Sequence, residues 1–108
     1  MSTYNARIRE SLRLVKSSNV RVNEIRVSTG EGLNHQVAKK SICKYLQGKG
    51  LHFITECIFK TGGRADIFVL EDFEVVEIMD SETMDSIEVK RLTYPVGVRI
   101  ICVQLNYI

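Results

Sequence analysis

The chain has 108 residues, 44% of them hydrophobic, and a single proline, so it can form one domain with a modest core and is not expected to be disordered. No run of residues approaches the roughly 18 apolar positions that a membrane span needs, and the polar start MSTYNARIRESLRL is unlike a secretory signal. The net charge of +2 is divided unevenly, because residues 1–50 hold ten basic and three acidic side chains, whereas residues 51–108 hold five basic and ten acidic ones. This division predicts either a basic surface for a polyanion with an acidic cluster elsewhere, or two ordinary solvated faces.

The first predicted element is a short basic amphipathic helix over residues 4–16. Ile8, Leu12 and Val15 recur at helical spacing, and basic side chains surround them, namely Arg7, Arg9, Arg13 and Lys16. The next stretch, SSNVRVNEIRVSTGEG, alternates only in part and predicts an irregular strand or an extended arm. Apolar side chains in these two segments exceed what a peripheral arm needs, so we expect a homodimer that uses them: Leu12, Val15, Val20 and Val22.

A second helix is predicted near residues 33–47. Its expected apolar stripe consists of Leu33, Val37, Ile42, Tyr45 and Leu46, and Gly48 and Gly50 supply the stop. Glu31 falls in or beside the first turn, where the helix dipole favours negative charge, so its ordinary role would be structural.

Three strands, a helix and a last strand should follow. The strand segments are HFITECIFK, RADIFVL, FEVVEIM and, after the helix, VGVRIICVQL. Short turns make the first three an antiparallel meander. The helix is expected near residues 82–93, with Ser81 as N-cap, Met84, Ile87 and Leu92 facing inward, and Pro95 ending it. Residues 1–28 are then a basic helix and arm, and residues 29–108 a core domain.

The cysteines Cys43, Cys57 and Cys102 are odd in number and far apart. They form no Cys-x-x-Cys pair, which argues against a zinc site. Buried, reduced thiols in the cytoplasm (that of a host cell if the chain is viral) are the simplest interpretation.

Two acidic residues interrupt the apolar strands, Asp66 in RADIFVL and Glu77 in FEVVEIM. If the strands pair through the turn at Glu71 and Asp72, Asp66 and Glu77 lie side by side on one face of the sheet. Adjacent carboxylates repel each other unless a cation is present, and Mg²⁺ suits one or two carboxylates with water and phosphate. The alternative is that Asp66 pairs with Arg64 and that Glu77 is solvated.

The acid on the first core helix, then GGRADIFVL, then VVEIM resembles the PD-(D/E)xK nuclease superfamily, which includes restriction endonucleases and archaeal Holliday junction resolvases. The resemblance spans residues 29–105 and implies an α/β (α+β) fold with an αβββαβ core, in which helices flank a mixed central sheet. It places the metal-binding acids of the family on Asp66, Glu77 and Glu31. The implied cofactor is Mg²⁺, or Mn²⁺ in its place.

This sequence departs from the motif at two positions. Ala65 stands where the family often has proline, and Met79 stands where it has a catalytic lysine. Some members take the lysine from a neighbouring position, and Lys60 is the first candidate here because strand parity could place it on the face of Asp66. Lys39 and Lys40 are weaker candidates, and Lys60 could equally be a solvated hairpin residue.

The implied function is a metal-dependent DNA endonuclease, whose substrate could be branched or otherwise structured DNA. The basic side chains expected to contact nucleic acid are Arg7, Arg9, Arg13, Lys39 and Lys40. His35, one turn after Glu31, either contacts phosphate or water in the site or is merely exposed or capping. Met79 favours an alternative, a catalytically inactive nuclease fold that binds nucleic acid or a protein, and a third interpretation is a protein-interaction domain without nucleic acid.

Overall fold

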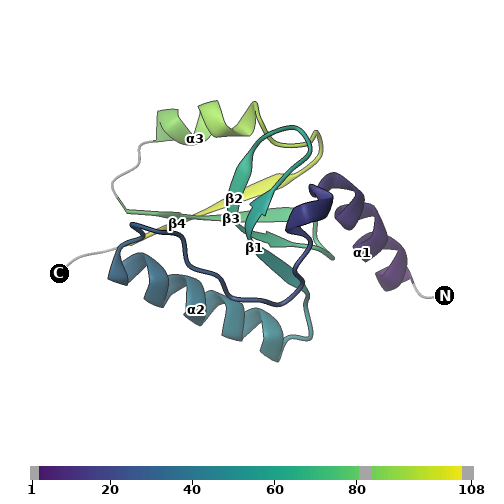
Figure 1. Ribbon diagram of the computed structural model, residues 1–108, viewed down its shortest axis with the longest axis horizontal. Coiled ribbons are helices and arrows are strands. Elements are labelled where there is room, and N and C mark those ends of the chain that lie inside the picture. Colours follow the sequence, from purple (N-terminus) through teal and green to yellow (C-terminus); the bar gives the residue numbers. More distant parts are fainter. Residues whose placement is uncertain (1–2, 81–83, 106–108) are drawn as a thin grey trace.

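Four strands form one mixed sheet in the computed structural model, which describes residues 3–80 and 84–105 (Figure 1). They are β1 (Phe53–Ile58), β2 (Arg64–Val69), β3 (Glu74–Met79) and β4 (Arg99–Gln104), in the order β1-β2-β3-β4. Short turns make β1, β2 and β3 antiparallel neighbours, whereas β4 runs parallel to β3 because the chain returns through helix α3 (Met84–Arg91). The predicted α+β fold with a mixed sheet is confirmed.

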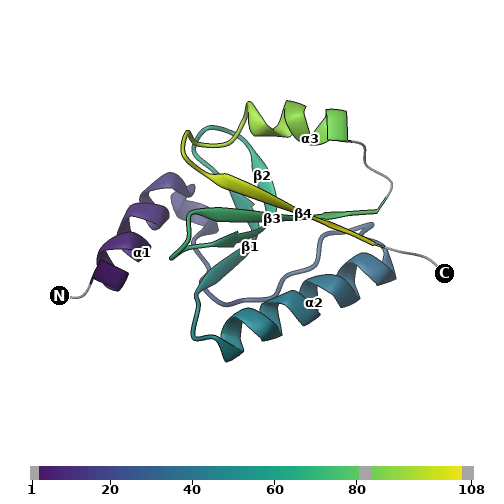
Figure 2. The ribbon, with the colours of Figure 1, turned by 180° about the vertical axis from the view of Figure 1, so that it is seen from behind.

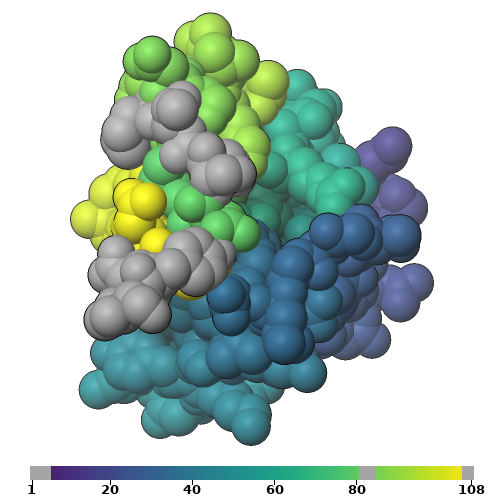
Figure 3. All heavy atoms as spheres, turned by 90° about the vertical axis from the view of Figure 1, so that its left-hand side faces the viewer, coloured from purple at the N-terminus to yellow at the C-terminus, as the bar shows by residue number. Residues whose placement is uncertain are grey.

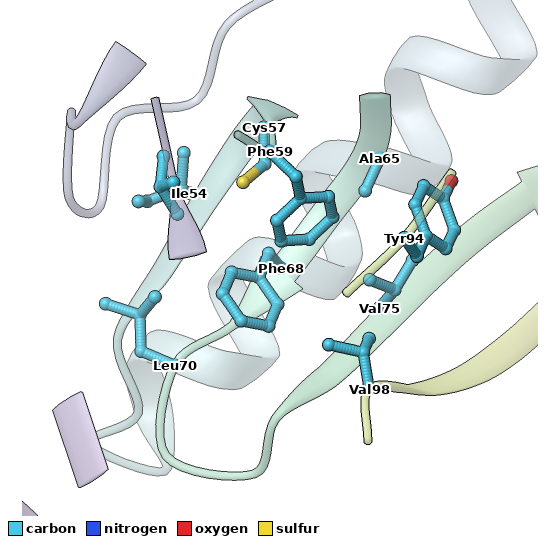
Figure 4. Close-up of a cluster of buried hydrophobic side chains, with 10 residues drawn as sticks. Ile54, Cys57, Phe59, Ala65, Phe68, Leu70, Val75, Tyr94 and Val98 are labelled. Carbon is cyan, nitrogen blue, oxygen red and sulfur yellow. The ribbon is translucent and has the colours of Figure 1, made fainter. Parts of the chain in front are cut away.

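Helices cover both faces of the sheet (Figures 1 and 2). Helix α2 (Leu33–Gly48) packs Cys43 and Leu46 against one face, where Ile67, Val69, Val76 and Ile78 meet it. Helix α1 (Thr3–Leu14) lies on the other face, where Val15, just after the helix, and the half-buried Leu12 pack near Phe68 and Val75. Figure 4 shows this second cluster, in which Phe59 packs edge-to-face against Phe68 and Tyr94.

The arm between α1 and α2 covers the edge of β1 and contains a short 3₁₀ helix (Ser17–Asn19) but no strand. Val15 forms an isolated antiparallel bridge with Phe59, and the Asn19 side chain accepts a hydrogen bond from the Ile58 N–H (2.7 Å) and donates one to the Glu56 carbonyl (3.2 Å). Further along, the Asn23 N–H donates to the Phe53 carbonyl (2.8 Å). The segment is therefore an extended arm that occupies an edge which would otherwise attract another strand.

The arm carries less free apolar surface than the sequence suggested. Val15 is 1% exposed and Leu12 is half-buried, because both belong to the core beside α1. Val20 and Val22 remain exposed at 39% and 37%.

Helix α2 begins and ends close to the predicted residues, but the predicted apolar stripe is wrong in part. Leu33, Val37 and Tyr45 are exposed, whereas Lys39 and Cys43 are fully buried. The helix is rotated about its axis from the expected orientation, because its inward face carries polar residues that find partners inside the fold.

Helix α3 ends at Arg91, so Leu92 lies beyond it and is 85% exposed instead of facing inward. Ile87 is buried as predicted. The predicted N-cap, Ser81, lies outside the described residues, and nothing is described of the Met84 side chain. Within the described part of the chain, no helix has the length and apolar character that crossing a membrane requires.

Candidate functional site

A cleft of about 400 Å³ opens where β3 ends and α2 begins, on the side of the molecule that faces the viewer in Figure 3. Its walls come from the loop before α2, from the first turn of α2, from β1 and β2, and from α3. The lining residues are Ser28, Thr29, Gly30, Glu31, Gly32, His35, Glu56, Arg64, Asp66, Asp80 and Lys90. Acidic side chains outnumber the Lys and Arg side chains among them, so an anion entering this cleft meets a predominantly negative wall.

Asp66 and Glu77 are neighbours at the point where β2 and β3 separate. The last paired residues of the two strands are Ile67 and Val76. Beyond this pair, the Asp66 carboxylate accepts a hydrogen bond from the Ile78 N–H at 2.8 Å. The same register places Asp66 opposite Glu77, as the sequence predicted. Burial is the main cause that raises the pKa of Glu77, and the charge of the neighbouring Asp66 carboxyl raises it further.

The Glu77 side chain is 1% exposed, and burial is the main cause that raises its pKa, to about 7. Its Oε1 accepts a hydrogen bond from the Tyr94 hydroxyl, while its Oε2 has no hydrogen-bond partner among the described residues. The nearest cation to Oε2 is the Lys90 ammonium of α3, with Nζ at 3.7 Å. A buried carboxylate oxygen without a hydrogen bond is costly, so the site favours a proton on Glu77 or a further cation beside it.

Glu31 lies just before α2 and is held by three donors. Its carboxylate accepts the Ser28 N–H (3.0 Å), contacts His35 Nδ1 and pairs with the fully buried Lys39 (Nζ–Oε1 2.9 Å). Burial raises the pKa of Glu31, but the hydrogen bonds from Lys39, Ser28 and His35 outweigh it, so that the pKa lies below its usual value. Glu31 is therefore an ionised carboxylate at neutral pH.

His35 joins Glu31 to the acid pair. Its Nδ1 faces Glu31, and its Nε2 lies 3.4 Å from Asp66 Oδ2. The imidazole thus sits between two carboxylates instead of in solvent, and the structure brings Glu31, Asp66 and Glu77 to one end of the sheet.

Glu56 is a further acid of the cleft that the sequence analysis did not single out. It lies in β1 opposite Asp66 but adopts a left-handed backbone conformation (φ 49°), and the ladder skips this pair. Its carboxylate binds Arg64 at 2.8 Å and approaches Lys39 at 3.7 Å. Arg64 therefore pairs with Glu56, not with Asp66 as the alternative reading of the sequence had it.

Several predicted functional residues lie elsewhere. Lys39 is fully buried against Glu31, so its ammonium is not exposed on the surface that a nucleic acid would meet. Lys60 is exposed in the β1–β2 turn, where its N–H donates to the Leu14 carbonyl, and it does not line the cleft. Arg7 of α1 donates to the Glu71 carbonyl at the opposite end of β2, and the exposed Arg9, Arg13 and Lys40 lie on the outer sides of α1 and α2.

Lys90 and Tyr94 contact Glu77 and were not predicted. Lys90 could have been found, since it follows the buried Ile87 by three residues and so shares its helix face. Tyr94 has no comparable signal, because it lies in the turn after α3 and reaches Glu77 only through the tertiary fold. Met79 is 3% exposed at the end of β3, so it supplies packing and no charge.

Among residues 3–80 and 84–105, no group of three or more His, Cys, Asp or Glu side chains is arranged to hold a metal ion. Two of the predicted metal-binding carboxylates are already bound by protein groups. Lys39 and His35 contact Glu31, and the Ile78 N–H donates to Asp66. The donor chemistry nevertheless fits a hard cation at one place, where Glu77 Oε2 lacks a hydrogen bond beside Asp66.

In comparisons with protein-family models, curated proteins and solved structures, none matches this chain.

Proposed function

We propose that this protein is a metal-dependent nuclease that hydrolyses phosphodiester bonds in DNA or another structured nucleic acid. The observation that carries the proposal is the pair formed by the half-buried Asp66 and the buried Glu77, in which one Glu77 oxygen lacks a hydrogen bond and the pKa of Glu77 is raised to about 7. Two carboxyl groups in contact are stable only if a proton or a cation lies with them, and a divalent metal is the cation that phosphate chemistry uses.

The charge of the cleft supports metal dependence. Glu31, Glu56, Asp66 and Asp80 line it against Arg64 and Lys90, so a phosphodiester would be repelled by the wall itself. Mg²⁺ or Mn²⁺ bound by Asp66 and Glu77 would lower the pKa of a bound water and neutralise charge on the phosphate. Glu31, held through His35 to Asp66, orients this pair and becomes a further ligand only if it gives up part of its contact with Lys39.

In this proposal Lys90 replaces the lysine that is missing at Met79. Its ammonium lines the cleft and lies 3.7 Å from Glu77 Oε2, so it reaches the acid pair from α3 instead of from β3. Lys60, the candidate from the sequence, lies in the β1–β2 turn outside the cleft wall.

Cleavage of plasmid, single-stranded and branched DNA with Mg²⁺, with Mn²⁺ and with EDTA tests the proposal. Asp66→Asn and Glu77→Gln should abolish cleavage and weaken Mn²⁺ binding, measured by electron paramagnetic resonance. The matched controls Asp72→Asn and Glu88→Gln change exposed carboxylates outside the cleft and should do neither. Wild-type protein that neither binds Mn²⁺ nor cleaves any of these substrates would refute it.

The role of Lys90 needs a separate comparison. Lys90→Ala should lower kcat strongly, Lys60→Ala should at most raise KM, and Lys40→Ala, an exposed change on α2, should do neither. A loss of kcat confined to Lys60→Ala would instead support the lysine that the sequence suggested.

A second candidate function is nucleic-acid or protein binding without catalysis. Met79 at the motif position and the engagement of Glu31 by Lys39 favour it. If the wild type is inactive, Met79→Lys places an ammonium two residues after Glu77, and a gain of Mg²⁺-dependent cleavage would show an otherwise intact site. If neither the wild type nor Met79→Lys cleaves DNA, the function without catalysis is favoured.

A further inference from the structure

Five basic residues belong to segments that meet at the β1–β2 turn, and we call them the basic platform: Lys16, Lys60, Arg64, Lys90 and Arg91. Lys16 follows α1, Lys60 and Arg64 belong to the turn and the start of β2, and the other two end α3. Lys16, Lys60, Arg64 and Arg91 are exposed, and the Lys90 side chain is 37% exposed.

The parts of the platform are fixed to one another by backbone contacts. The Lys16 N–H donates to the Ile58 carbonyl (2.8 Å), and the Lys60 N–H donates to the Leu14 carbonyl (2.9 Å), which ties the end of α1 to the turn. The Gly63 N–H and the Thr61 hydroxyl both donate to the Thr93 carbonyl, which ties the turn to the segment after α3.

Gly63 permits this second connection. A Cβ atom there would lie 2.5 Å from the Tyr94 ring and 2.6 Å from the Thr93 carbonyl oxygen, so any side chain would force the turn away from the α3 segment. The backbone segments that carry the platform are therefore fixed relative to one another before a partner binds.

Three of the platform cations, Arg64, Lys90 and Arg91, contact acidic neighbours. Arg91 meets Glu88 at 3.5 Å on the surface, where such a pair contributes little and is readily exchanged for another anion. Arg64 contacts Glu56 of the cleft and Lys90 contacts the buried Glu77, and because Arg64 and Lys90 themselves line the cleft, the platform continues directly into the cleft wall.

We propose that the basic platform is the surface on which a nucleic-acid phosphate backbone lies, and that it delivers one phosphate to the cleft. The inference rests on the proposed function for the identity of the partner. It differs from the sequence-based expectation, because Arg7 of α1 donates to the Glu71 carbonyl in the turn that follows β2, whereas the platform lies around the turn that precedes β2.

The test is the salt dependence of binding, measured by fluorescence anisotropy with labelled duplex DNA, single-stranded DNA and RNA in EDTA. Three double variants remove the same charge from exposed positions: Lys60→Gln/Arg91→Gln on the platform, Arg7→Gln/Arg9→Gln on α1, and Lys40→Gln/Lys44→Gln on α2. Only the platform variant should flatten the slope of log affinity against log salt, by about 2 on duplex DNA if both side chains contact phosphates. Circular dichroism and thermal unfolding should confirm that all three variants are folded.

Other outcomes overturn the inference. A flattened slope in the α1 variant alone would place the nucleic acid on α1, and equal changes in all three variants would show a response to net charge only. If the wild type binds none of the three nucleic acids, nucleic acid is not the partner of the platform. Because EDTA excludes metal-dependent cleavage, an inactive protein can still pass this test and an active nuclease can fail it.

Discussion

Lys90 and Met79 show how a charge can reach the same carboxylate from a different element. The motif that the sequence resembles places lysine two residues after the second acid, and here Met79 fills that position within the core. Lys90 approaches Glu77 from α3, with 3.7 Å between its Nζ and Glu77 Oε2. Because an ammonium on a flexible stem can be supplied from several directions, Met79 alone does not argue against the proposed nuclease activity.

The raised pKa of Glu77, to about 7 against an ordinary 4.5, makes stability depend on pH. Its contribution is fully present below about pH 4.5, and it is lost as the pH rises through about 7, because the unfolded chain ionises before the folded one does. Urea unfolding at about pH 5 and about pH 8 should therefore show a smaller free energy of unfolding at the higher pH, by a few kcal/mol at most. Glu77→Gln should reduce this difference, and an unchanged pH dependence in that variant would contradict a raised pKa.

Lys39 is a second residue whose charge is held inside the fold, because its buried ammonium pairs with Glu31. Lys39→Met leaves Glu31 buried without its main cation and should destabilise the protein by about 3–5 kcal/mol. Lys40→Met, at the exposed neighbouring position, should change stability by no more than about 0.5 kcal/mol.

Chemical denaturation of both variants and of the double variant Lys39→Met/Glu31→Gln measures the pair. The double variant should recover part of the loss, because it no longer buries an unpaired carboxylate. A double variant as unstable as Lys39→Met would show that lost packing, not charge, is the cause.

Among the elements, the arm and β1 depend on each other through side-chain amides. The buried Asn19 supplies both a donor and an acceptor to the β1 backbone, at Glu56 and Ile58. Since β1 has no further strand on this side, these bonds replace those of a neighbouring strand.

Asn19→Ala should lower stability by about 1–3 kcal/mol, because it leaves backbone groups of β1 unpaired. Amide hydrogen exchange should show faster exchange at Ile58, while Asn34→Ala, an exposed change on α2, should leave that exchange rate unaltered. Unaltered protection at Ile58 in Asn19→Ala would mean that the arm contributes nothing to that edge.

The elements differ in how far the sequence predicts them. The strands and their register follow from β-branched runs joined by short turns, and this register alone places Asp66 beside Glu77. The orientation of α2 does not follow, because an apolar count treats Lys39 and His35 as outward residues, whereas Glu31 from the preceding loop holds both inside. Glu56 escapes prediction for a local reason, since its place in the cleft requires a left-handed backbone that non-glycine residues rarely adopt.

On the scale of the whole molecule, the predicted homodimer remains a prediction. Of the four apolar residues on which it rests, Leu12 and Val15 belong to the core, whereas Val20 and Val22 are exposed. Sedimentation velocity at micromolar concentrations should give the mass of a dimer, and Val20→Ser/Val22→Ser should shift it toward monomer if the arm forms the contact. A monomer in the wild type would reject the prediction.

The arm also sets a limit on how copies of this protein can combine. A sheet whose two edges are both available can add neighbours without end, which is the route to fibres. Here the arm occupies the β1 side, and the sheet ends on its other side at β4. Any growth that uses strand edges must then join β4 to β4, and after one such union neither member has a further edge to offer. Within the described sheet, the hydrogen bonds that hold the arm in place therefore limit association through strand edges to pairs.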